Sequence, residues 1–322
     1  MRPRETEQNV AVIDLGSNSI KLLVARRSAS GDGVEPVLTA LRETRISAGI
    51  HSQQPRIQPA AFAAGLQSVC ELFEAAQAFK PVSFRLVATS AVRDASNGSE
   101  FMQAIRAQTG LVGEILSGEA EARAIARGIA CDPSLAGVKA FFQMDIGGGS
   151  FEFVSIRDGV ATQAISLQLG AVRLLERFVT DPQAPIPAAA RGALRQLVQT
   201  ELQSAGFSFA PNDAPLIATG GAFAVARMCL GAPAREVIED TDPVLTRQAL
   251  SELADRLSAM PLTARSEVAF LPRQRADILP VALDAIVAAM DFAGRSECRH
   301  SLYNLRYGIA AEEVFGIMND EL

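Results

Sequence analysis

The feature that most constrains the fold of this chain is an internal repeat at an offset of 131 residues. The segment DLGSNSI at 14–20 aligns with DIGGGSF at 145–151, so that an aspartate, the first glycine and a serine recur. Apolar residues also recur along the following strand, at Leu22/Phe153 and Leu23/Val154. Because such self-similarity marks a duplicated structural unit, we expect two lobes of the same fold.

The order of the predicted elements is that of an α/β protein. Residues 10–27 are two runs rich in β-branched residues around a Gly/Ser/Asn turn, which predicts a hairpin, and residues 34–48 are expected to extend its sheet. Residues 140–167 repeat this signal. Apolar periodicity and strand-like runs predict helices at 59–79, 98–108, 117–130, 170–178, 186–205, 220–230, 246–258, 276–293 and 302–318, and strands at 84–90 and 112–116.

The length of 322 residues is that of two domains. We expect a first lobe over residues 1–123, completed by the C-terminal helix at 302–322, and a second lobe over 124–301. Since no Pro- or Ser-rich linker separates them, the boundary near 123–130 is expected to be a helix crossing between lobes.

Composition excludes several classes of function. A formal charge of −6 and a pI near 5.2 argue against a general binder of nucleic acid or of membrane surfaces, which use clustered positive charge. The N-terminus lacks a signal-peptide core and no stretch reaches membrane-spanning length, so a cytoplasmic location is expected. The four cysteines form no CxxC pattern and are expected to be buried and reduced.

Only two histidines occur, His51 and His300, and we expect both to be structural or on the surface. That leaves little material for a Ser-His-Asp or Cys-His centre. Carboxylates, a metal ion and main-chain amides must therefore carry any chemistry.

The repeated turn is suited to phosphate. An aspartate at the end of a buried strand, followed by glycines and small hydroxyl residues, places a carboxylate beside a nest of main-chain N–H groups, and glycine lets phosphate oxygens approach closely. A single glycine-rich turn is more often just a hairpin. Two copies, facing each other across a cleft, would grip successive phosphates, while Asp14, Asp145 and Glu152 could hold Mg²⁺.

Over nearly its whole length the sequence resembles the exopolyphosphatase/guanosine pentaphosphate phosphohydrolase family, within the actin, Hsp70 and sugar-kinase superfold. The resemblance rests on AVIDLGSNSIKLLVA (11–25), ATSAVRDASN (88–97), ILSGEAEARAIARG (115–128), MDIGGGSFEF (144–153) and SLQLGAVRLLERF (166–178), with weaker echoes at 217–227, 275–280 and 305–308. It implies two duplicated actin-like lobes, each a mixed sheet flanked by helices, with an interlobe cleft.

The resemblance also implies roles for individual residues. Glu121, in the SGxxEAR segment, would activate the attacking water, although acids also favour the first turn of a helix for its dipole. Asp145 and Glu152 match the family's Mg²⁺-associated carboxylates (Mn²⁺ being the alternative), and Asp14 is a further metal or water ligand or a support of its turn. From alternation alone, Glu152 could instead lie on the solvent face of a half-exposed strand.

The phosphate-binding residues implied by the resemblance come from three segments. They are Gly16, Ser17 and Asn18, then Arg93, and then Gly147, Gly148, Gly149 and Ser150. The segment TGGA at 219–222 resembles the superfold's third glycine loop and is expected to be a tight strand-to-helix connection. Arg123 and Arg127 could extend the anion site, but we expect them on a solvated helix face.

Three functions remain open at this point. The first is Mg²⁺-dependent release of terminal phosphate from inorganic polyphosphate, with guanosine pentaphosphate (pppGpp) as the alternative substrate. The second is a non-hydrolytic sensor of alarmone or nucleotide, and the third a kinase of the same superfold, which lacks support from a sugar-recognition motif. The length is expected to leave no room for the additional C-terminal helical region of larger relatives. Tyr307 stands where an acidic residue is common in the family. A homodimer is expected.

Overall fold

The computed structural model describes residues 8–31, 33–50, 55–210, 213–231 and 237–316. The chain forms two compact units, each with its own sheet. Unit 1 comprises the chain up to Lys139, Gly159–Ala161 and the chain from Tyr303 onward, and unit 2 comprises Ala140–Asp158 and Thr162–Leu302. The prediction of an α/β fold is confirmed. His51 lies outside the described residues.

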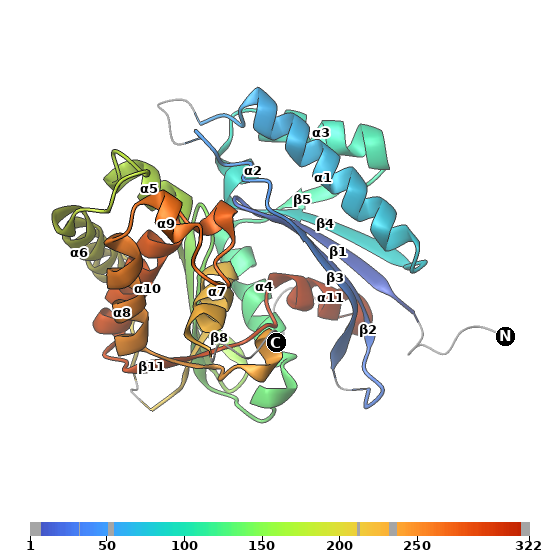
Figure 1. Ribbon diagram of the computed structural model, residues 1–322. Coiled ribbons are helices and arrows are strands. Elements are labelled where there is room, and N and C mark those ends of the chain that lie inside the picture. The colour runs from blue at the N-terminus through green and yellow to red at the C-terminus, as the bar shows by residue number, and fades with distance from the viewer. Residues whose placement is uncertain (1–7, 32, 51–54, 211–212, 232–236, 317–322) are drawn as a thin grey trace. The chain divides into compact units, whose positions relative to one another are not determined.

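Unit 1 contains a five-stranded sheet in the order β3-β2-β1-β4-β5. Strands β1, β2 and β3 are antiparallel neighbours, and β4 and β5 continue the sheet parallel to β1. Their bounds are Val10–Leu15 (β1), Ile20–Arg27 (β2), Val34–Arg42 (β3), Ser83–Ala88 (β4) and Gly113–Ile115 (β5). Helices α1 (Pro59–Gln77) and α3 (Gly98–Thr109) cover one face, and α4 (Gly118–Ala130) and α11 (Leu305–Phe315) cover the other (Figure 1).

Alternation along β1 sets which residues face which helices. Ala11, Ile13 and Leu15 belong to the buried cluster that includes residues of α1 and α3. Because successive side chains of a strand point to opposite faces, Asp14 lies on the face covered by α4 and α11. The short helix α2 (Ser90–Asp94) follows β4 directly and was not predicted as a separate element.

Two glycines let α4 and α11 cross closely. A Cβ on Gly308 would overlap the carbonyl oxygen of Ala124, and a Cβ on Gly128 would overlap that of Asn304. Main-chain atoms cannot move aside as a flexible side chain can, so the two helices approach closely only because both positions are glycine. This crossing fixes the helix that carries Glu121.

Unit 2 contains a six-stranded sheet in the order β10-β11-β9-β6-β7-β8. Its strands are β6 (Phe141–Ile146), β7 (Phe151–Arg157), β8 (Val160–Leu167), β9 (Leu216–Thr219), β10 (Val244–Thr246) and β11 (Glu297–His300). Its helices are α5 (Ala171–Phe178), α6 (Ala188–Ser204), α7 (Gly221–Leu230), α8 (Arg247–Ser258), α9 (Leu262–Arg265) and α10 (Leu279–Ala293). The helix α10 is apolar around nearly its whole circumference and is the centre of the core.

The repeat seen in the sequence is also a repeat of register. In β1–β2, Asp14 lies opposite Lys21, and in β6–β7, Asp145 lies opposite Glu152. Both members of the second pair stand 131 positions after those of the first. The two glycine-containing turns therefore close equivalent hairpins.

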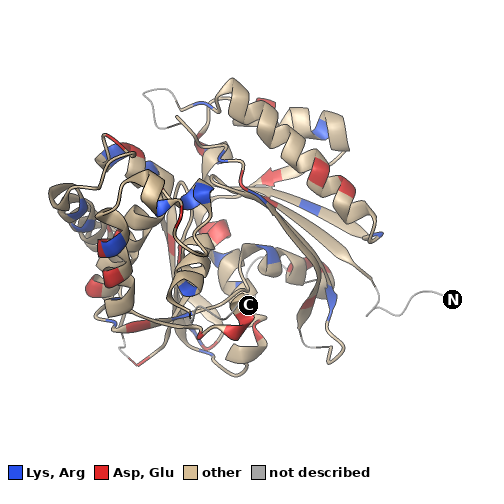
Figure 2. Cartoon of the chain, viewed as in Figure 1, with Lys and Arg blue, Asp and Glu red and all other residues tan. Residues whose placement is uncertain are grey.

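Charges on the surface helices are mixed in sign. Figure 2 shows acidic and basic residues interspersed on α6 and α8, where Arg191 forms an ion pair with Asp255. Across the described stretches of chain, no helix combines the length and the apolar character that crossing a membrane requires. The four cysteines are free, but only Cys298 is fully buried, so the expectation that all four are buried is wrong for Cys70, Cys131 and Cys229.

Candidate functional site

In unit 1 the first glycine turn joins β1 to β2. A Cβ on Gly16 would come within 2.8 Å of the Ser19 carbonyl oxygen, so the turn requires glycine there. Ser17 and Asn18 are buried, and their carbonyls accept from the amides of Ser47 and Arg45. The side-chain amide of Asn18 is also engaged, donating to Glu43 at 2.8 Å and accepting from Arg45 Nε at 3.0 Å. These bonds hold the turn in one conformation.

Asp14 lies under this turn and is almost completely buried. Its Oδ2 is 3.5 Å from Lys21 Nζ, whereas its Oδ1 has no hydrogen-bond partner among the described residues. Burial lowers the pKa of Arg306, and the nearby charge of Asp14 partly opposes this effect. Asp14 thus has two cations near it, and its Oδ1 could bind a water molecule or a metal ion.

Arg93 and Glu121 meet in unit 1. The Arg93 guanidinium, on α2, donates from Nη1 to the Leu116 carbonyl at 2.8 Å and to Glu121 Oε2 at 3.1 Å. The helix α4 begins at Gly118 after the Ser117 cap, whose hydroxyl accepts from the Ala120 amide. Glu121 is 7% exposed, so its carboxylate is not a solvent-exposed charge that interacts only with the helix dipole.

The neighbouring acid in the same helical turn behaves differently. The Glu119 side chain is 61% exposed and pairs with Arg123 four residues later at 2.8 Å. A simple dipole interpretation therefore describes Glu119, whereas Glu121 is directed into the protein toward Arg93. The sequence alone could not separate these two roles.

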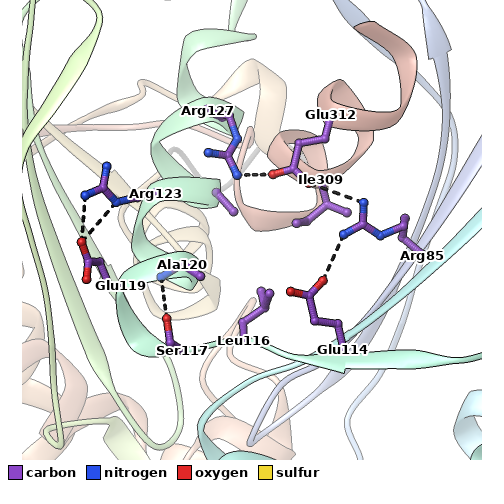
Figure 3. Close-up of a pocket in the computed structure, with 11 residues that line it drawn as sticks. Arg85, Glu114, Leu116, Ser117, Glu119, Ala120, Arg123, Arg127, Ile309 and Glu312 are labelled. Carbon is purple, nitrogen blue, oxygen red and sulfur yellow. Dashed lines mark hydrogen bonds and ion pairs between the residues drawn. The ribbon is translucent and has the colours of Figure 1, made fainter. Parts of the chain in front are cut away.

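A pocket of about 240 Å³ lies beside α4 in the same unit (Figure 3). Its ion pairs link α11 to α4 and to the sheet: Arg127 pairs with Glu312, and Arg85 lies 3.2 Å from Glu114 and 3.5 Å from Glu312. Arg127 is buried, so the expectation that it belongs to a solvated face is wrong. Glu121 does not line this pocket, whose Arg127–Glu312 pair links α4 to α11.

In unit 2 the second glycine turn, Gly147–Ser150, is tied to the start of α5. The amides of Ala171 and Val172 donate to the carbonyls of Gly147 and Gly148, both at 2.9 Å. A Cβ on Gly170 would overlap the main chain of the turn. The amides of Gly148 and Gly149 donate to no main-chain carbonyl of the described residues, as expected of a nest that binds an anion.

The two carboxylates of unit 2 stand side by side. Asp145 and Glu152 are direct cross-strand partners. Asp145 accepts from the Thr219 hydroxyl, and Glu152 accepts from the Ser166 hydroxyl at 2.7 Å. Glu152 is 1% exposed, so the alternative that it occupies a solvent face is wrong. Thr219 and Ser166 were not singled out in the sequence; only their place on strands next to β6 and β7 makes them neighbours.

The third glycine turn begins α7. Gly220 has φ +102°, and a Cβ there would lie 2.9 Å from Asp145 Oδ1, so the turn packs against this carboxylate. A Cβ on Gly221 would overlap the Arg275 guanidinium. Arg275 is therefore a further cation at this turn. In the sequence, Arg275 begins the segment RADILP (275–280), whose resemblance to the family is weak and indicates no contact for the arginine.

The carboxylates of unit 2 suit a divalent cation of the Mg²⁺ type. Carboxylate oxygens are its preferred protein ligands, and the cross-strand partners Asp145 and Glu152 supply them. Within the described part of the chain, no three His, Cys, Asp or Glu side chains form a ready metal cluster. The remaining ligands of such an ion would be water or substrate oxygens.

Comparison with known proteins identifies the family of the chain. The model of the Ppx/GppA phosphatase family matches residues 23–315. The Ppx/GppA family member of Aquifex aeolicus is 23% identical, with a TM-score of 0.79 over 96% of this chain and 98% of that one. An exopolyphosphatase from Cytophaga hutchinsonii is 22% identical, with a TM-score of 0.84 over 98% and 100% of the two chains. An exopolyphosphatase-like protein, 23% identical, reaches 0.86 over 96% and 100%.

The two mixed sheets flanked by helices match the two-lobed, actin-like architecture of these structures. The family match begins after the first glycine turn and covers the second glycine turn and the helix that carries Glu121. The chain belongs to the Ppx/GppA phosphatase family.

Proposed function

We propose that this hydrolase of phosphoanhydrides releases the terminal phosphate of inorganic polyphosphate with the help of Mg²⁺. The observation that carries the proposal is the contact between Arg93 and the buried Glu121. In unit 1 this contact brings together a carboxylate that could orient an attacking water and a guanidinium that could bind phosphate oxygens.

Glu121 is the residue that would orient the attacking water or accept its proton. In phosphoryl transfer, the protein contributes mainly by positioning the reactants and by neutralising charge on the equatorial oxygens. Arg93 holds Glu121 through Nη1 and is itself held by the Leu116 carbonyl. A carboxylate fixed in this way loses little freedom when it binds water, which favours catalysis.

The glycine turns would bind the phosphates. Gly16, Ser17 and Asn18 form one turn and Gly147, Gly148, Gly149 and Ser150 the other, and the amides of Gly148 and Gly149 are available for an anion. Asp145 and Glu152, with Asp14 as a further ligand, would hold the metal ion. When bound, Mg²⁺ would neutralise charge on the phosphate oxygens; the serine and threonine that donate to the two carboxylates would keep their oxygens oriented.

Arg275 supports polyphosphate over a nucleotide as the substrate. The third glycine turn faces the adenosine in nucleotide-binding relatives of the superfold, but here the Arg275 guanidinium lies against Gly221. A buried guanidinium is suited to another phosphate group and takes up the space beside the turn. Hydrolysis of pppGpp is the alternative activity, and pppGpp is the second substrate to be assayed.

The test measures phosphate release by the full chain from size-defined polyphosphate and, separately, from pppGpp, with Mg²⁺, with Mn²⁺ and with a chelator. Glu121→Gln should lower kcat by about 10²–10⁴-fold, the usual contribution of general acid–base catalysis. Glu119→Gln is the matched control, because Glu119 lies in the same helical turn but is exposed. It should leave kcat within about twofold of the parent.

Three results would contradict parts of the proposal. No release from either substrate would remove hydrolysis and favour a non-hydrolytic sensor. Faster release from pppGpp than from polyphosphate would overturn the substrate assignment. Equal loss in the Glu119 and Glu121 variants would show that the helix terminus, and not the buried carboxylate, is responsible.

A further inference from the structure

The pocket beside α4 has the features of a second binding site in unit 1. It is formed by residues of β4, β5, α4, α11 and the segment between β5 and α4 (Figure 3), and Glu121 does not line it. Its volume of about 240 Å³ lies below the range of about 300–1,000 Å³ that is usual for drug-sized ligands. A ligand of this pocket is therefore a small molecule.

The charged side chains that line the pocket balance each other. They are three arginines and three glutamates, Arg85, Arg123, Arg127, Glu114, Glu119 and Glu312. A simple anion would meet three carboxylates and a simple cation would meet three guanidinium groups, and like charges repel at short distance. A molecule that carries both charges can instead place each of them beside the opposite charge. The lining therefore favours a zwitterion.

Arg127 supplies donors for the negative group of such a ligand. Its side chain is only 6% exposed, and its Nη2 pairs with Glu312, whereas its Nε has no hydrogen-bond partner among the described residues. A buried donor without a partner is costly, so an acceptor bound beside this guanidinium would be stabilising. Ser117 and Ala120, in the first turn of α4, line the same pocket, and the positive end of a helix dipole also favours a carboxylate.

Glu114 supplies an acceptor for the positive group. It lies on β5, and Figure 3 shows it across the pocket from Arg127. Its side chain is 59% exposed and lies 3.2 Å from Arg85, an exposed pair of the kind that contributes little to stability. The Glu114 carboxylate can therefore accept from an ammonium group of a ligand. Aliphatic side chains complete the lining, those of Leu116, Ala120, Ala124 and Ile309.

We propose that this pocket binds a small α-amino acid with an aliphatic side chain, with its carboxylate at Arg127 and its ammonium group at Glu114. Such a molecule carries both charges and an apolar group, which are the three features that the lining calls for. The Leu116 carbonyl accepts from Arg93, so the bound amino acid would lie beside the segment that holds Arg93.

The experiment uses the full chain with L-alanine, L-valine and L-leucine as probes. In calorimetric titrations at least one of them should bind with a Kd below about 1 mM. At about 10 mM this probe should raise the melting temperature by at least about 2 °C. Tyrosine fluorescence follows the melting, because both tyrosines lie in unit 1 with the pocket. The N-acetyl form of the probe lacks the ammonium group and its amide lacks the carboxylate, so each should bind at least about tenfold more weakly.

Two variants place the binding in this pocket. Glu114→Gln removes the charge that faces the ammonium group, and Ala120→Leu fills the space, so each should weaken binding at least about tenfold. Glu71→Gln is the matched control, because Glu71 is also a partly exposed glutamate paired with an arginine, but lies on α1 at the opposite face of the sheet. It should leave the Kd within about twofold of the parent.

Melting of each variant without a probe, followed by circular dichroism, confirms that it is folded. No binding of any of the three amino acids to the parent would overturn the proposal. So would equal binding of the acetylated or amidated form, or binding that survives both Glu114→Gln and Ala120→Leu. Because binding is measured directly and no variant touches Glu121, Asp145 or Glu152, the outcome is independent of the proposed catalysis.

Discussion

Asp284 should be among the most costly residues to remove from unit 2. Its carboxylate is completely buried in α10 and accepts four hydrogen bonds from two arginines of α6. The distances from Arg191 Nε and Nη2 are 2.7 and 2.9 Å, and those from Arg195 Nε and Nη2 are 2.9 and 2.6 Å. These bonds raise the pKa of Arg191 above its ordinary value.

The expected loss follows from what Asp284→Ala leaves behind. Two guanidinium groups, with side chains 15% and 26% exposed, would lose their shared counterion. Breaking a buried pair in this way costs about 3–5 kcal/mol, because the remaining charge stays poorly solvated. Asp284→Asn should cost less, since three of the four bonds end on Oδ1 and an amide oxygen can replace it.

The matched control is Asp255→Ala. Asp255 also pairs with Arg191, at 2.6 Å, but its side chain is 63% exposed, so its loss should cost about 0.2–1 kcal/mol. Urea unfolding followed by circular dichroism reports both units. The chain has no tryptophan, and both tyrosines, Tyr303 and Tyr307, lie in unit 1, so tyrosine fluorescence reports that unit. Asp284→Ala should lower the circular-dichroism midpoint more than the fluorescence midpoint. Equal small losses for Asp284→Ala and Asp255→Ala would refute the reasoning.

Further predictions concern the site and the fold around it. Arg93→Lys keeps the charge but loses the guanidinium that donates to both Leu116 and Glu121, so kcat should fall at least about tenfold in phosphate-release assays. Gly308→Ala should cost about 1–3 kcal/mol by forcing α11 from α4, a loss that thermal unfolding would measure. Burial lowers the pKa of His300 to about 3. Below about pH 6.5 the unfolded state therefore binds more protons than the folded state, and the free energy of unfolding decreases as the pH is lowered. Relative to His300→Gln, the parent should lose about 1 kcal/mol of this free energy per pH unit between pH 6 and 4 in urea titrations.

Much of the fold could be predicted because it is encoded in local patterns. The two hairpins and the long helices follow from alternation and periodicity, and the repeat predicted their equivalence. Glu121 and Glu119 differ through a contact that the sequence does not record, the bond from Arg93 to Glu121 at 3.1 Å. These two residues are 28 positions apart, and strand β5 lies between them in the chain.

The missed features share a long sequence separation. Arg275 lies against Gly221, and Arg127 pairs with Glu312 across 185 positions. With 30 basic and 36 acidic residues in the chain, charge alone gives no means of choosing such partners. Helix packing decides the Arg127–Glu312 pair, because α11 packs against α4 at a crossing of two glycines.

The duplicated hairpins also explain why the two units cannot play the same part. The position opposite the repeated aspartate is Lys21 in the first hairpin and Glu152 in the second. Lys21 supplies a positive charge 3.5 Å from Asp14, so the first hairpin neutralises its own carboxylate. In the second hairpin two carboxylates are cross-strand partners, and such like charges repel each other unless a cation neutralises them. Of the two hairpins, the second is therefore the one whose paired carboxylates suit a bound cation. A single difference in a duplicated frame, lysine at 21 and glutamate at 152, thus gives two similar hairpins different charge.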